Sequence, residues 1–96
     1  MAEQQRYQLT LAAQTVGLPV RQVRRYVMIG LVPATPVERG ELVLDEHGLA
    51  RLRKIRRLSA DVGLNTVGIE VALHLIDQID ALQAELDRQR TLAVRG

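Results

Sequence analysis

The sequence predicts a mainly α-helical fold with one small β-hairpin and a long helix at its C-terminal end. The 96 residues are 47% apolar and 25% charged, a composition typical of one small globular domain. Aromatic residues make up only 2%, so Leu, Val, Ile and Ala must fill the core, and this favours helices over a β-sandwich. Gly and Pro divide the chain into short helices, and none follows Gly68 until the last residue.

Composition also excludes several classes of protein. The chain contains no cysteine, which rules out disulfide scaffolds, cysteine-ligated zinc and thiol nucleophiles, and the cytosol is the default compartment. No apolar run approaches the roughly 20 residues that a membrane span needs. Residues 1–10 lack the basic and apolar regions of a signal peptide. We therefore expect a cytoplasmic protein that does not bind a membrane.

The first two predicted helices are separated by a tight turn. Thr10 is placed to cap the first helix, and Gly17 is placed to end it in the left-handed conformation. Pro19 stands at the start of the second helix, where its missing N–H costs nothing. The second helix runs to Gly30 with valines at helical spacing, namely Val20, Val23 and Val27. Together these signals predict a helix-turn-helix.

A small hairpin and a third helix follow. The turn signal Glu38-Arg39-Gly40 leads into the aliphatic run Leu42-Val43-Leu44, which predicts a hairpin, or wing. Asp45 is expected to cap the third helix, and Gly63 to end it. Its apolar stripe consists of Leu49, Leu52, Ile55 and Leu58.

The last predicted helix begins after the cap Asn65 and runs to about Thr91. We expect a head at residues 1–64 and a helix with a tail at residues 65–96, within one domain. The first part of the helix can pack on the head through Ile69, Leu73 and Ile76. Apolar residues then repeat at the seam spacing of a short coiled coil, which suggests an antiparallel homodimer through Leu75, Ile79, Leu82 and Leu86.

Charge is distributed unevenly along the chain. Residues 61–87 carry six carboxylates and no Lys or Arg, whereas residues 19–57 carry nine basic side chains against four acidic ones. A basic head suits an acidic partner such as DNA, and an acidic helix suits a basic protein partner. Such charges can also simply keep a helix soluble.

These elements, in this order, resemble the MerR-like winged helix-turn-helix superfamily. The matching positions are Gly17, Val23, Arg24, Tyr26, Gly30 and Leu31. Residues 44–86 further resemble the chaperone-modulator CbpM branch, through Arg57-Leu58, the run Asp61-Val62-Gly63-Leu64-Asn65, and Gly68-Ile69. The resemblance implies a small bacterial protein that binds the J-domain of a DnaJ-like or CbpA-like co-chaperone and restrains its action with Hsp70.

The J-domain hypothesis selects two groups of residues. Because Val27, Met28 and Ile29 are consecutive, they cannot all face one core, and at least one should be exposed as a protein contact unless the hairpin covers it. Since the second helix of a J-domain is basic, we expect it to meet the acidic helix. The predicted partner-binding residues are Glu70, His74, Asp77, Asp80, Met28 and Ile29.

The alternative hypothesis is a MerR-type transcription factor that places its second helix in the major groove of DNA. Its predicted contacts are Arg21, Arg24, Arg25 and Tyr26. Against it, Pro19 and Glu41 stand where DNA-binding relatives present hydroxyl and basic side chains, and Glu38 or Glu46 could pair with the arginines instead. One molecule could also bind both partners in competition.

Nothing in the sequence indicates catalysis or a cofactor. His47 and His74 lie far apart on different predicted helices, so they do not suggest a metal pair. Asp77 and Asp80 share a polar helix face with no sign of a dry pocket, and no phosphate-binding glycine loop is present. We expect a protein that is not an enzyme and needs neither metal nor cofactor.

Overall fold

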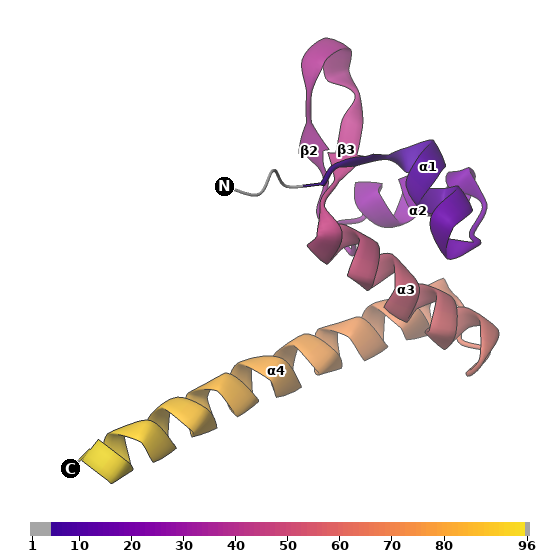
Figure 1. The fold of residues 1–96 in the computed structure, drawn as a ribbon. Coiled ribbons are helices and arrows are strands. Elements are labelled where there is room, and N and C mark those ends of the chain that lie inside the picture. The colour runs from indigo at the N-terminus through magenta and orange to yellow at the C-terminus, as the bar shows by residue number, and fades with distance from the viewer. Residues whose placement is uncertain (1–4, 96) are drawn as a thin grey trace. The chain divides into compact units, whose positions relative to one another are not determined.

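The computed structural model describes residues 5–95, which are mainly helical with one small sheet (Figure 1). This confirms the predicted fold class. The chain divides after Leu64 into two compact units, residues 1–64 and 65–96. Within the described residues, the first unit holds three α-helices and the sheet, and the second holds one long helix.

The helix-turn-helix consists of α1 (Leu9–Val16) and α2 (Val20–Met28). Gly17 ends α1 as predicted, because its φ of 86° is left-handed and its N–H donates to the carbonyl oxygen of Ala13 at 2.8 Å. Pro19 is the extended residue immediately before α2. Local capping chemistry therefore fixes both sides of this turn.

Three short strands form an antiparallel sheet: β1 (Tyr7–Gln8), β2 (Thr35–Pro36) and β3 (Leu42–Leu44), with β3 in the middle. A 3₁₀ turn at Glu38–Gly40 joins β2 to β3. Residues 35–44 are the predicted hairpin, and we call them the wing.

Strand β1 was not predicted, and it corrects the expected start of α1. Gln8 is extended, with a ψ of 152°, because it pairs with Val43 of β3. Helix α1 consequently begins at Leu9, and Thr10 lies inside its first turn instead of capping it. The prediction that Thr10 caps this helix is therefore wrong.

A side-chain contact ties β1 to the third helix. The Tyr7 hydroxyl donates a hydrogen bond to the carboxylate of Glu46. This bond requires the phenolic proton, so it raises the pKa of Tyr7 above its ordinary value of 10.0. The contact also occupies Glu46, one of the two carboxylates expected to pair with the arginines of α2.

Helix α3 (Glu46–Ala60) packs closely against the segments before it. Its cap is Asp45, as predicted, whose carboxylate accepts from the N–H of Gly48 at 2.8 Å. Farther along, the Nε of Arg51 donates to the carbonyl oxygen of Leu31 at 3.0 Å. The apolar core of this unit is Leu9, Ala12, Ala13, Val16, Val23, Tyr26, Leu31, Val32, Val43, Leu44, Leu49, Leu52 and Ile55.

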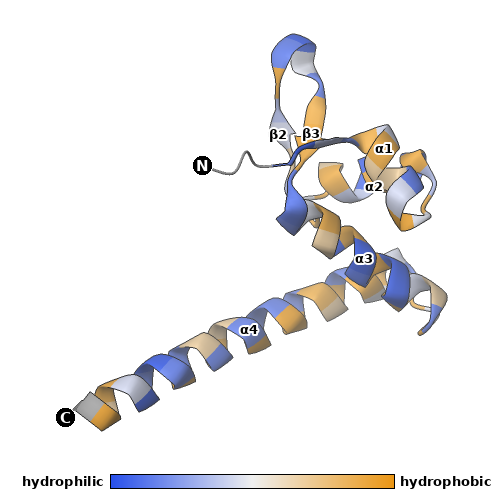
Figure 2. Cartoon of the chain, viewed as in Figure 1, coloured by the Kyte–Doolittle hydropathy of each residue, from blue (hydrophilic) through white to orange (hydrophobic). Residues whose placement is uncertain are grey.

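The second unit is α4 (Thr66–Arg95). Asn65 caps it as predicted, accepting from the N–H of Gly68 at 2.9 Å, and the helix continues past the predicted end at Thr91. Ile69 and Leu73 are buried, whereas hydrophobic and hydrophilic residues alternate along the rest of the helix (Figure 2). No helix within residues 5–95 is both long enough and apolar enough to cross a membrane.

Candidate functional site

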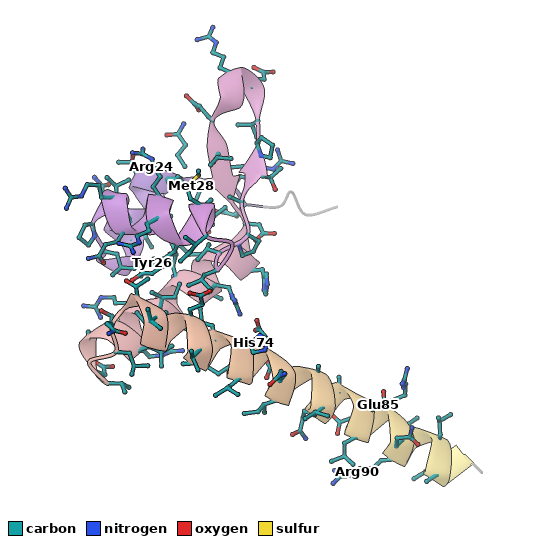
Figure 3. The ribbon with its side chains drawn as sticks, turned by 180° about the vertical axis from the view of Figure 1, so that it is seen from behind. Arg24, Tyr26, Met28, His74, Glu85 and Arg90 are labelled. Carbon is teal, nitrogen blue, oxygen red and sulfur yellow. The ribbon has the colours of Figure 1, made fainter. Side chains whose placement is uncertain are left out.

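One face of α2 gathers exposed positive charge. Arg24, Arg25 and Met28 follow Arg21 by three, four and seven residues, so the four side chains share one side of the helix, and all four are exposed. Figure 3 shows Arg24 and Met28 on one side of α2 and Tyr26 on the other. We call these four residues the outer face of α2.

Tyr26 does not belong to the outer face of α2. The prediction that Tyr26 contacts DNA is therefore corrected. Only 4% of its surface is exposed, because it lies three residues from buried Val23 on the inner stripe of α2. Its carbonyl oxygen accepts the N–H of Leu31 at 2.9 Å. Tyr26 therefore positions the turn after α2 and has no free surface for a partner.

Met28 and Ile29 behave as the helical periodicity predicted. Met28 is 74% exposed and Ile29 44% exposed, so the wing does not fold back to cover them. Ile29 is already the capping residue at the end of α2, with a φ of −88° and a ψ of 5°. Only Met28 therefore continues the line of the three arginines.

The tip of the wing carries an arginine that the sequence reasoning did not select. Arg39 is exposed and has a φ of 62°, a left-handed conformation unusual for a residue with a side chain. Gly40 follows with a φ of 76°, and the N–H of Val37 closes the turn by donating to the carbonyl oxygen of Glu41 at 2.7 Å. The signal was the turn Glu38-Arg39-Gly40, since the residue before the glycine stands at the apex.

The outer face of α2 and the wing meet in a shallow hollow. Arg24 from α2 and Glu41 with Leu42 from the wing line it, together with Gln8 of β1 and the first two residues of α1. The hollow brings a positive and a negative side chain to one surface. Glu41 thus remains an unfavourable neighbour for a phosphate, as its position in the sequence suggested.

Helix α4 presents three acidic residues and one histidine of the J-domain prediction. Glu70, His74, Asp77 and Asp80 are all exposed. They belong to the second unit, whereas Met28 and Ile29 belong to the first. The predicted partner-binding residues are therefore divided between the two units, and each group is a candidate surface in its own right.

A second face of α4 is apolar. The residues of the predicted seam are exposed, from 46% for Leu86 to 69% for Leu82. Val67 and Val71 are exposed as well and extend the stripe toward the start of the helix. The apolar stripe is Val67, Val71, Leu75, Ile79, Leu82 and Leu86.

The described residues present no metal-binding cluster and no buried polar side chain. Within residues 5–95, no three His, Cys, Asp or Glu side chains are close enough to hold a metal ion. No charged or polar side chain is buried in this part of the chain. The prominent features are charged and apolar surfaces on helices.

The helix-turn-helix formed by α1 and α2, together with the wing, defines a winged helix-turn-helix protein. The chain belongs to the MerR HTH family of regulatory proteins, whose model matches residues 8–91. It is similar to a Streptomyces coelicolor protein described as "Putative heat shock protein HspR", with 35% identity over 79 residues. That match covers 81% of this chain and 52% of the relative, so the chain spans about half the length of the curated relative.

Proposed function

We propose that the protein is a DNA-binding transcriptional regulator that inserts α2 into the major groove. The observation that carries this proposal is the outer face of α2, on which Arg21, Arg24 and Arg25 are exposed together. Three guanidinium groups on one short helix suit phosphates and guanine edges, which accept paired hydrogen bonds from arginine. Membership in a regulatory helix-turn-helix family supports the same function.

The wing adds one favourable and two unfavourable charges. Arg39 at its tip is exposed and suits a phosphate beside the groove. Glu38 and Glu41, which flank the tip, are exposed carboxylates that repel the backbone. We therefore expect α2 to supply most of the affinity and the wing to supply little.

Arginine substitutions on α2 test this proposal. The double variant Arg24→Gln/Arg25→Gln should bind a duplex selected by the full chain from a random pool at least about tenfold more weakly, because two charge-assisted contacts are lost. The matched control Arg88→Gln/Arg90→Gln removes the same charge from α4 and should change the affinity little. Fluorescence anisotropy measures both. Equal losses in the two variants would refute the assignment to α2.

A second candidate function is favoured by the acidic surface of α4. Glu70, Asp77 and Asp80 are exposed in a segment, residues 61–87, that contains no Lys or Arg. Such a surface attracts a basic helix, and the nearby apolar stripe can hold it. The acidic surface and the sequence resemblance to chaperone modulators together support binding to the J-domain of a DnaJ-like co-chaperone. Such binding would inhibit the action of that co-chaperone with Hsp70. The similar Streptomyces coelicolor protein is itself described as a heat shock protein.

Charge reversal tests the chaperone candidate. Asp77→Lys/Asp80→Lys should weaken binding to the isolated J-domain of the host's DnaJ-like co-chaperone at least about tenfold, measured by calorimetric titration. The control Asp61→Lys/Asp87→Lys changes the net charge by the same amount outside the predicted contact. No heat of binding with the unsubstituted protein, or equal affinities in both variants, would contradict this candidate.

We further propose that α4 joins two copies of the chain. The seam residues Leu75, Ile79, Leu82 and Leu86 are exposed in the single chain and follow the 4, 3, 4 spacing of a coiled coil. A dimer would present two α2 helices to one DNA duplex, as helix-turn-helix proteins with two-fold symmetry do.

A further inference from the structure

Met28 completes the outer face of α2, although it is the one apolar residue there. It lies four residues after Arg24 and three after Arg25, so all three side chains leave the helix on the same side. Its 74% exposure is high for a methionine, a residue type that is more often buried. The fold therefore places an exposed apolar group at the C-terminal end of a positively charged helix face.

The dimensions of this face match a few base pairs. Arg21 and Met28 are seven residues apart, which is about 10 Å along the helix. This distance corresponds to about three base-pair steps of B-DNA. The outer face of α2, Met28 included, is therefore long enough to span about three base pairs in the major groove.

The major groove offers one apolar group, the 5-methyl of thymine. Methionine suits this contact because its unbranched side chain is flexible and its thioether is polarizable. Ile29 is less suited, because it caps the helix and is less exposed. We propose that Met28 reads sequence by packing its thioether and terminal methyl against a thymine methyl group in the major groove. This inference rests on the proposed function, in which α2 enters that groove.

Deoxyuridine isolates the proposed contact, because it pairs with adenine as thymine does and lacks only the 5-methyl group. The probe is a duplex that the full chain selects from a random-core pool. Each thymine in the selected core is replaced in turn by deoxyuridine, and affinity is measured by fluorescence anisotropy. We expect a loss of about five- to tenfold at one or two adjacent positions in each half-site, and little change elsewhere.

Substitutions at position 28 link that loss to methionine. Met28→Gln keeps the length of the side chain and removes its apolar end, so this variant should bind the thymine and deoxyuridine duplexes equally. Met28→Leu should restore part of the preference. Val62→Gln, at an exposed apolar position of the same unit, is the control and should behave like the unsubstituted protein. Circular dichroism checks that each variant is folded.

The outcomes separate this inference from the proposed function. If the protein binds DNA and no deoxyuridine position matters, or if Met28→Gln retains the full thymine preference, the inference is wrong and DNA binding stands. If Met28→Gln leaves DNA affinity intact and weakens only a J-domain complex, Met28 is a protein contact and the inference is again wrong. If no duplex binds at any salt concentration, both the proposed function and the inference fail.

Discussion

Gly48 shows how closely single residues are fitted in the head. A Cβ atom added there would lie 2.9 Å from the carbonyl oxygen of Pro33 and 3.2 Å from the Cβ of Leu44. Its N–H also donates to the capping carboxylate of Asp45. The start of α3 can therefore approach the loop after α2 and strand β3 only because this position has no side chain.

We expect Gly48→Ala to destabilise the protein by about 1–3 kcal/mol, because the backbone oxygen of Pro33 must move and the gain in helix propensity is at most about 1 kcal/mol. The neighbouring exposed substitution His47→Ala is the control and should change stability by less than about 0.5 kcal/mol. Urea unfolding followed by circular dichroism measures both free energies. If Gly48→Ala were as stable as the control His47→Ala, the close approach of position 48 to Pro33 would not be tight.

Helical periodicity predicted only in part which side chains of α2 are exposed. It correctly indicated an exposed residue among Val27, Met28 and Ile29, because side-chain directions on a helix follow from spacing alone. Tyr26 was assigned to DNA although its spacing from Val23 places it on the buried stripe. Arg39 was not selected, although the turn signal placed it before Gly40, because the left-handed conformation that puts it at the apex of the wing is visible only in the structure.

At the scale of elements, the N-terminal caps of α3 and α4 were predicted correctly, whereas strand β1 was missed and α3 ends at Ala60, before the predicted Gly63. Asp45 and Asn65 cap α3 and α4 as expected, since a cap is a contact between residues three apart in the sequence. Strand β1 was missed because its two residues pair with residues 43 and 44, far along the chain. The start of α1 was then predicted wrongly for the same reason.

The apolar stripe of α4 yields a prediction about assembly. Ile79→Lys/Leu82→Lys places two charges at the centre of the seam and should convert a dimer to a monomer, because charged groups in an apolar interface lose their hydration. Ala81→Lys/Ala84→Lys introduces the same charges at exposed positions outside the seam and should leave the dimer intact. Sedimentation velocity measures both. A monomeric unsubstituted protein over the accessible concentration range would contradict dimerisation through α4.

At the scale of the whole molecule, the chain combines a basic head with an acidic helix. The net charge is only +2, so the distribution of charge matters more than its sum. The basic outer face of α2 suits DNA, and the acidic α4 suits a basic protein. The sequence predicted this asymmetry fully, because it depends only on the order of the residues. It predicted a J-domain as the partner and DNA as the alternative, and the choice between them stays a prediction, because it depends on side chains that folding brings together, such as Arg24 and the wing.

The salt dependence of DNA binding tests the central claim most directly. Each phosphate neutralised by an arginine releases counterions, which contributes about −0.9 to the slope of log affinity against log salt concentration. With all three arginines of α2 at phosphates the slope reaches about −3 for each DNA-bound protomer, and Arg24→Gln/Arg25→Gln should then reduce its magnitude by about 2, or by less for an arginine that contacts a base edge. A slope near zero, or a slope that this double variant leaves unchanged, would contradict binding through the outer face of α2.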